Sequence, residues 1–280
     1  MADLSCPACT APDEHVRLVA QTASGQKELG CEECGHRWLR GQARRVPSGR
    51  PPGRSSTSSQ AVFDRASQVS PEVAAKVTAA KARYLARDRA PRPGAAQYQA
   101  RYQALFSPEG LGGASAADLR EFATSPFGVS SGSSHAFLAA WDALGDYEAA
   151  RLTRGTIHYL LHGPAHLPLE QRLTQLVQGT HVVGMAGFKE TLLTRTLCVA
   201  HPERFLPVLG YGGTQGGKRS IAKQVFGLDL PRIDSSAITV GRAVVWSNDL
   251  LVGLVGTGFT DLHDASLFLL QARKERVAAG

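Results

Sequence analysis

Two pairs of cysteines stand near the start of the sequence at the spacing of a metal site. Cys6 and Cys9 form one Cys-x-x-Cys pair, Cys31 and Cys34 form the other, and 21 residues separate them. Each pair can place two thiolates on one tight turn, so that four sulfurs close a tetrahedron around Zn2+. Because the chain supplies all four ligands, no coordination position stays open. The spacing therefore predicts a structural zinc ion in a small zinc ribbon or treble clef.

Disulfide bonds and redox pairs are the alternative explanations of these cysteines. Residues 1–25 contain no basic stretch followed by an apolar one, which a secretory signal would require. A cytoplasmic, reducing environment is therefore expected, and there this spacing indicates a metal site. His36 could replace one cysteine as a ligand. The fifth cysteine, Cys198, lies in an apolar stretch and is expected to be a core thiol.

Composition places the chain among globular proteins outside the membrane. Its 280 residues are 43% hydrophobic, enough for one small module and one or two ordinary domains. No apolar run approaches the roughly 18 to 20 residues of a membrane span. The longest run, at residues 250–255, is interrupted by Gly253. The bias toward Ala, Arg and Gly suggests a bacterial origin.

The positive charge is concentrated in one part of the chain. Residues 37–92 hold 13 Lys or Arg against three acidic residues, whereas the rest holds 18 basic and 21 acidic residues. A tract with this excess attracts polyanions by releasing their counterions, and the attraction weakens steeply with salt. The alternative is a solvated linker whose arginines only maintain solubility.

The sequence divides into three parts at its changes of composition. Residues 1–40 form the expected zinc ribbon, residues 41–95 a basic flexible linker and basic helix, and residues 96–280 an α-helical domain. Pro, Gly and Ser dominate residues 41–60, which cannot pack a core. Ser70 and Pro71 predict a helix that begins there, ends near Ala90 and exposes its basic side chains.

Helical signals dominate the third part, so the predicted fold class is mainly α. Ser115 and Asp118 have the spacing of a capping box. Asn248 and Asp249 are expected to cap a helix that begins at Leu250. Further helices are expected at about residues 134–143, 146–161, 168–178, 188–200 and 262–275.

Gly184 and Gly187 predict a tight hairpin between two helices. Glycines allow the positive φ angles of such a turn and expose backbone N–H groups at the start of the second helix, where an anion such as a DNA phosphate can bind. Lys189 would lie beside that anion. An ordinary helix–helix connection uses the same glycines without any ligand, and the spacing alone does not separate the two explanations.

Two family resemblances center on this region. Residues 181–197 and 201–208 resemble the helix-hairpin-helix region of DNA-repair glycosylases. Together with Tyr102 to Leu111, Asp118 to Phe122 and Trp246 to Leu251, they more closely resemble an α-helical module that accompanies ATPases in modification-dependent (type IV) restriction and phage-defence systems. This second likeness covers about residues 97–275. It implies a DNA-binding helical domain and an ATPase or nuclease partner.

Neither of two catalytic motifs is complete. The glycosylases place an aspartate about twenty residues after the hairpin, but residues 206–211 contain no carboxylate. Gly212 to Lys218 matches G-x4-G-K of a phosphate-binding loop, yet Arg219 stands where a hydroxyl would hold Mg2+. Nucleotide hydrolysis is therefore not expected, although this loop could contact a nucleic-acid backbone.

The sequence thus predicts a bacterial DNA-binding protein that recognises double-stranded DNA, with modified bases as a possible target, in defence or DNA processing. The residues expected to contact nucleic acid are Gly184, Gly187, Lys189, Lys218, Arg219, Lys223, Arg44, Arg45, Lys76, Lys81 and Arg83. A glycosylase-like base-excision enzyme and an adaptor for an ATPase or nuclease are the two alternatives.

Overall fold

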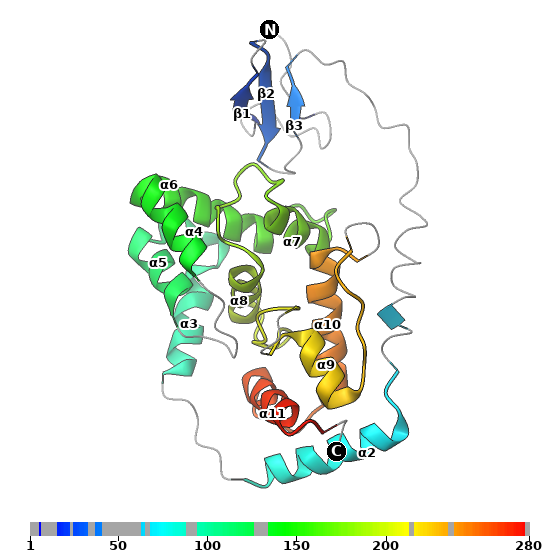
Figure 1. Ribbon diagram of the computed structural model, residues 1–280. Coiled ribbons are helices and arrows are strands. Elements are labelled where there is room, and N and C mark those ends of the chain that lie inside the picture. The colour runs from blue at the N-terminus through cyan, green and yellow to red at the C-terminus, as the bar shows by residue number, and fades with distance from the viewer. Residues whose placement is uncertain are drawn as a thin grey trace.

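A small antiparallel sheet precedes a mainly helical body in the computed structural model (Figure 1). The structure describes residues 6, 16–22, 25–32, 37–40, 63–64, 68–87, 94–125, 134–212, 216–234 and 238–277. The expectation of a mainly α-helical chain with a small β-structure near its start is confirmed. None of the described helices has the length and apolar character that a membrane span requires.

The sheet contains three strands in the order β1-β2-β3. The strands are β1 (Val16–Gln21), β2 (Lys27–Cys31) and β3 (Arg37–Leu39). Val16 pairs with Cys31, so the end of the central strand β2 is held in register with the start of β1. The sheet therefore fixes the backbone of the first cysteine of the second pair.

Capping residues set the start of several helices. The helices are α2 (Pro71–Leu85), α3 (Ala95–Leu105), α4 (Pro108–Gly113), α5 (Ala116–Thr124), α6 (His135–His162), α7 (Leu169–Gln178), α8 (Glu190–Ala200), α9 (Lys218–Phe226), α10 (Val240–Val255) and α11 (Leu262–Lys274). The Ser70 side chain accepts from the backbone N–H of Val73 at 3.3 Å, and Ser115 and Asp118 form a complete capping box. Both predicted helix starts are confirmed.

The long helix α6 is bent at Gly145. This glycine has φ 76° and ψ 161°, values outside the helical region, which divide α6 into two helical segments. The Trp141 indole N–H donates to the Asp146 carboxylate across the bend at 2.7 Å. The sequence predicted two helices with a break at this position, in agreement with the structure.

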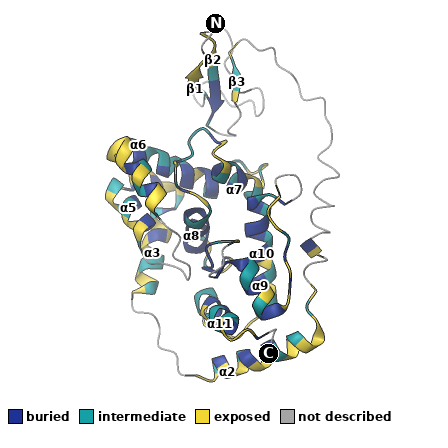
Figure 2. Cartoon of the chain, in the orientation of Figure 1, coloured by how far each residue is buried: buried dark blue, intermediate teal, exposed yellow. Residues whose placement is uncertain are grey.

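Helix α8 lies at the center of the body and is buried on nearly all sides (Figure 2). A helix that is enclosed in this way has no solvent face, so its polar groups need partners inside the protein. The Arg195 guanidinium, only 4% exposed, donates to the carbonyls of Phe122 and Ala123 at 3.0 and 3.1 Å. These carbonyls lie at the C-terminal end of α5, where the helix dipole also favours a positive charge.

Helix α2 is packed against the body, contrary to the exposed basic helix that the sequence predicted. Val77, Ala80 and Tyr84 are buried on one face, and α2 contacts α9 and α11. The Tyr84 hydroxyl donates to the Asp264 carboxylate at 2.9 Å. The helix also ends at Leu85, before the predicted end at Ala90. The prediction was wrong because a narrow apolar stripe is enough to bury one helix face.

Asn248 and Asp249 lie inside α10 and do not cap a new helix at Leu250. Asn248 is fully buried; its side-chain oxygen accepts from the Leu206 N–H at 2.9 Å and its amide donates to the Arg204 carbonyl at 2.8 Å. The polar pair was misread as a helix start because Asn248 turns inward to satisfy the backbone of the loop after α8.

Close packing between α7 and α10 depends on Gly241, where a Cβ atom would lie 1.8 Å from the Glu170 carbonyl oxygen. We expect Gly241→Ala to lower the free energy of unfolding by about 1 to 3 kcal/mol or more, because the two helices must move apart. Urea unfolding measures this change.

Gly253 provides a matched control on the same helix, since a Cβ built there would have no atom of another element within 4 Å. Gly253→Ala should raise stability by about 0.5 to 1 kcal/mol, because alanine is the better helix former. Equal effects of the two substitutions would contradict the close approach of α7 and α10.

Candidate functional site

The two described cysteines of the predicted zinc site lie together. Cys6 and Cys31 come from different Cys-x-x-Cys pairs, are fully buried, and share one small cluster against which Trp38 and Leu167 pack. Cys9, Cys34 and His36 lie outside the described residues. No three His, Cys, Asp or Glu side chains are grouped as metal ligands within the described part of the chain. The two buried thiols fit a thiolate zinc site, and completing it requires the second residue of each pair.

The segment that carries Gly184 and Gly187 is longer than a tight hairpin. Helix α7 ends at Gln178, Gly179 has φ 70°, and α8 begins at Glu190. Residues 179–189, named here the α7–α8 connection, therefore join the two helices, and the predicted turn is only one part of them.

Packing on α6 explains Gly187, and a turn within the connection explains Gly184. Gly187 has φ 76°, and a Cβ there would lie 2.5 Å from the Phe137 backbone. The N–H of Gly184 donates to the His181 carbonyl at 3.2 Å, and the N–H of Met185 donates to the Thr156 hydroxyl at 2.7 Å. These contacts are those of an ordinary helix–helix connection, the alternative that the spacing left open, and they require no bound phosphate.

The sheet lies directly on the α7–α8 connection. A Cβ at Gly30 of β2 would lie 2.4 Å from Val182 Cγ1 and 2.6 Å from Val19 Cγ2. Next to this contact, the buried His181 ring stacks on Tyr159 of α6 with centroids 3.6 Å apart and planes inclined at 21°. The glycine therefore allows the sheet, the connection and α6 to meet at one junction.

Burial keeps His181 neutral at this junction. Removal of the ring from water lowers its pKa to about 4, and the positive charge of Arg37 on β3 acts in the same direction. The backbone of Glu32 partly opposes this effect. A protonated imidazole is thus unfavourable where the sheet meets the helical body.

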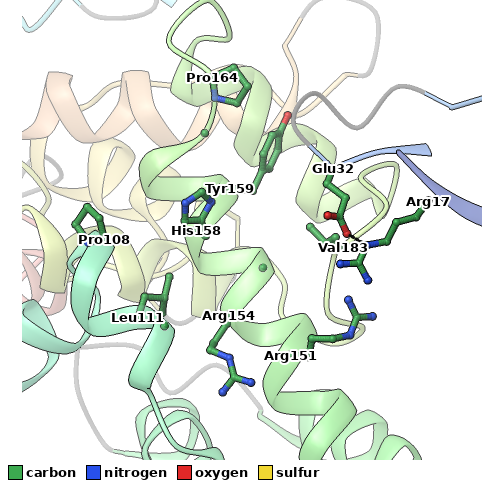
Figure 3. A pocket seen from close by; sticks show the side chains of 13 residues that line it. Arg17, Glu32, Pro108, Leu111, Arg151, Arg154, His158, Tyr159, Pro164 and Val183 are labelled. Atoms are coloured by element: carbon green, nitrogen blue, oxygen red, sulfur yellow. Dashed lines mark ion pairs between the residues drawn. The ribbon is translucent and has the colours of Figure 1, made fainter. Parts of the chain in front are cut away.

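A cavity of about 420 Å³ opens at the same junction (Figure 3). Its walls come from β1, the end of β2, α4, α6, the loop after α6 and the α7–α8 connection. The lining residues are Arg17, Glu32, Pro108, Leu111, Gly112, Arg151, Arg154, Gly155, His158, Tyr159, Gly163, Pro164 and Val183. The volume falls in the range of small-molecule sites, about 300 to 1,000 Å³.

Three arginines against one carboxylate make the cavity lining positive. Arg17 and Glu32 form an ion pair on the sheet side and face Arg151 (Figure 3). Arg151 forms two hydrogen bonds with Glu148, at 2.6 and 2.8 Å, and this pairing lowers the pKa of Glu148. Arg154 donates to the Ala114 carbonyl at 2.7 Å and has no acidic partner among the described residues.

The structure separates the predicted nucleic-acid contacts near the glycine-rich loop into different roles. Lys218 is fully buried, donates to the Val244 carbonyl at 3.0 Å, and has a pKa lowered by burial to about 8. It therefore cannot reach a nucleic-acid backbone from this position. Arg219 is held by the Leu230 carbonyl and Asp229, whereas Lys223 is exposed.

The other predicted contacts are also divided. Lys81 donates to the carbonyls of Val255 and Thr257 at 2.6 Å each, so it attaches α2 to the end of α10. Lys76 pairs with Glu72 at 3.1 Å, and Arg83 is exposed. Lys189 is exposed and donates to the Val177 carbonyl at 2.7 Å. Arg44 and Arg45 lie outside the described residues.

The sequence interpretation missed the cavity. Arg151, Arg154 and His158 have the spacing of one helix face, which was the available signal. Nothing in the sequence indicates that Arg17 and Glu32 lie opposite that face, because this depends on how the sheet docks.

No protein-family model matches this chain, and no curated protein or solved structure matches it. The resemblance to restriction modules and glycosylases therefore stays an expectation from short motifs.

We expect stability to depend on pH through His181. Its pKa in the folded protein lies below the ordinary value of 6.5, so stability should be complete above about pH 6.5 and fall as the pH drops toward 4. His181→Phe keeps a ring against Tyr159, so the pH-dependent part of the free energy of unfolding, up to about 3 kcal/mol, should disappear.

Urea unfolding at several pH values measures the effect, with substitution of the exposed His166 as control. Identical pH profiles for wild type and His181→Phe would contradict a buried neutral imidazole.

Proposed function

We propose that the protein binds double-stranded DNA through a basic segment, residues 41–62, whose flanking residues Arg40 and Phe63 lie in the folded protein. The observation that carries this proposal is the position of the two flanking residues. Arg40 follows β3 in the sheet that docks on the α7–α8 connection. Phe63 is 2% exposed and packs edge to face on Trp246 of α10, with ring centroids 5.7 Å apart. The residues on both sides of the segment thus belong to the folded protein, while the segment itself lies outside the described residues.

The charge of this segment suits a polyanion. It contains Arg44, Arg45, Arg50 and Arg54 and no acidic residue. The exposed cations Arg83, Lys189 and Lys223 can add contacts on the helical body.

A structural zinc ion held by the four cysteines of the two pairs belongs to the same proposal. Zinc would join the two pairs and so stabilise the sheet that holds one end of the basic segment. A role in bacterial defence, with recognition of modified DNA and an ATPase or nuclease partner, rests on the motif resemblance alone.

Neutralising the basic segment tests DNA binding. A variant with Arg44, Arg45, Arg50 and Arg54 changed to Gln should bind a duplex much more weakly. The slope of log affinity against log salt should also become less steep by about 3 to 4, since each phosphate contact contributes about 0.9. Fluorescence anisotropy at several salt concentrations measures both quantities.

Lys218→Met is the matched control, because this lysine is buried away from solvent. If the variant folds, its salt slope should equal that of wild type. An unchanged slope in the four-arginine variant would refute the proposed contact.

Cys31→Ser tests the zinc site. We expect zinc content, measured by mass spectrometry of the purified protein, to fall from about one ion per chain to near zero. Cys198→Ser should keep its zinc, because Cys198 lies in the core and its thiol donates to the Leu206 carbonyl at 3.2 Å. Equal zinc contents in the two variants would contradict the assignment.

A further inference from the structure

Both cationic and apolar residues line the junction cavity. The cationic residues are Arg17, Arg151 and Arg154, and the apolar residues include Leu111 and Val183. A ligand that fits both must carry an anionic group and an apolar or aromatic group. We propose that this cavity binds a nucleoside monophosphate, a role separate from DNA binding by the basic segment.

The arginines are suited to phosphate because their guanidinium groups are already positioned. Glu148 holds Arg151 through two hydrogen bonds, and the Ala114 carbonyl holds Arg154 through one. An arginine has five N–H donors, so each retains donors for phosphate oxygens. Arg154 has no acidic partner among the described residues, and its charge is therefore the one least compensated.

The remaining wall leaves room for a base and sugar. Pro108, Leu111, Pro164 and Val183 supply apolar contacts, and Gly155 adds no side chain to the wall formed by α6. Polar groups on the lining residues include the His158 ring and the Tyr159 hydroxyl, which interacts with Gln175. Inorganic phosphate alone would make no use of these apolar residues.

Glu32 acts as an internal competitor for the ligand. Its carboxylate pairs with Arg17 at the cavity wall, as Figure 3 shows. A phosphate that approaches Arg17 must weaken this pair and is also repelled by the carboxylate. Removal of the Glu32 charge should therefore strengthen binding, whereas removal of the Arg154 charge should weaken it.

Calorimetric titration of the full chain with adenosine 5′-monophosphate tests the proposal. We expect Arg154→Gln to weaken binding about tenfold or more, because a hydrogen bond to a charged group is lost. Glu32→Gln should strengthen binding by about three- to tenfold. Arg120→Gln is the control, since this arginine pairs with Asp142 at the surface and does not line the cavity. Thermal unfolding checks that each variant is folded.

Further ligands identify the chemistry and source of the phosphate. Adenosine and inorganic phosphate should each bind at least about tenfold more weakly than the nucleotide. If a 5′-phosphorylated single strand of DNA competes with the nucleotide, the site binds the phosphorylated end of a strand. If the strand does not compete, the site binds a free nucleotide.

Several results would overturn the proposal. These are no binding of the nucleotide to folded wild type, equal binding of adenosine, or equal effects of Arg154→Gln and Arg120→Gln. If Arg154→Gln does not fold, Glu32→Gln decides alone: unchanged or weaker binding overturns the proposal. The four-arginine variant of the basic segment should keep its nucleotide affinity, so failure of DNA binding and failure of this site are distinguishable.

Discussion

The absence of a side chain at Gly30 is the constraint on which the junction depends. A Cβ atom there would lie 2.4 Å from Val182, so only glycine lets β2 lie this close to the α7–α8 connection. The contact places Arg17 and Glu32 opposite the arginines of α6 and encloses His181 against Tyr159. It also holds the sheet from which the basic segment begins. One contact at Gly30 thus joins the sheet that carries Cys31 to the helical body, shapes the cavity and holds the sheet that precedes the basic segment.

Exposure, rather than charge alone, separates the structural cations from those available for binding. Arg195 and Lys218 are buried; Arg195 donates to two backbone carbonyls and Lys218 to one. Burial lowers the pKa of both groups, which is the cost of removing a cation from water. Lys81 likewise attaches α2 to the body. The net charge of +7 therefore overstates the charge that a ligand can reach.

Local signals in the sequence predicted much of the helical structure. The caps at Ser70 and Ser115, and the break near Gly145, depend on residues close together in the chain, and the structure agrees with them. Interpretations that depend on distant contacts were less successful. Asn248 looks like a cap until the loop that it satisfies, at Leu206, is known. Lys218 looks like a phosphate ligand until α10 is seen to cover it.

The cavity was not predictable for the same physical reason. Its arginines lie on β1 and α6, and only the docking of the sheet brings these elements together. The cysteine spacing predicts that a metal module exists, but it does not state which surface of the body receives that module.

The junction can be tested most directly by filling the space at Gly30. Gly30→Val should force the sheet away from Val182, so we expect the affinity for adenosine 5′-monophosphate to fall at least about tenfold and duplex affinity to fall with it, while zinc content stays near one ion per chain. Nucleotide and duplex affinities equal to those of wild type would contradict the claim that sheet docking creates the binding unit.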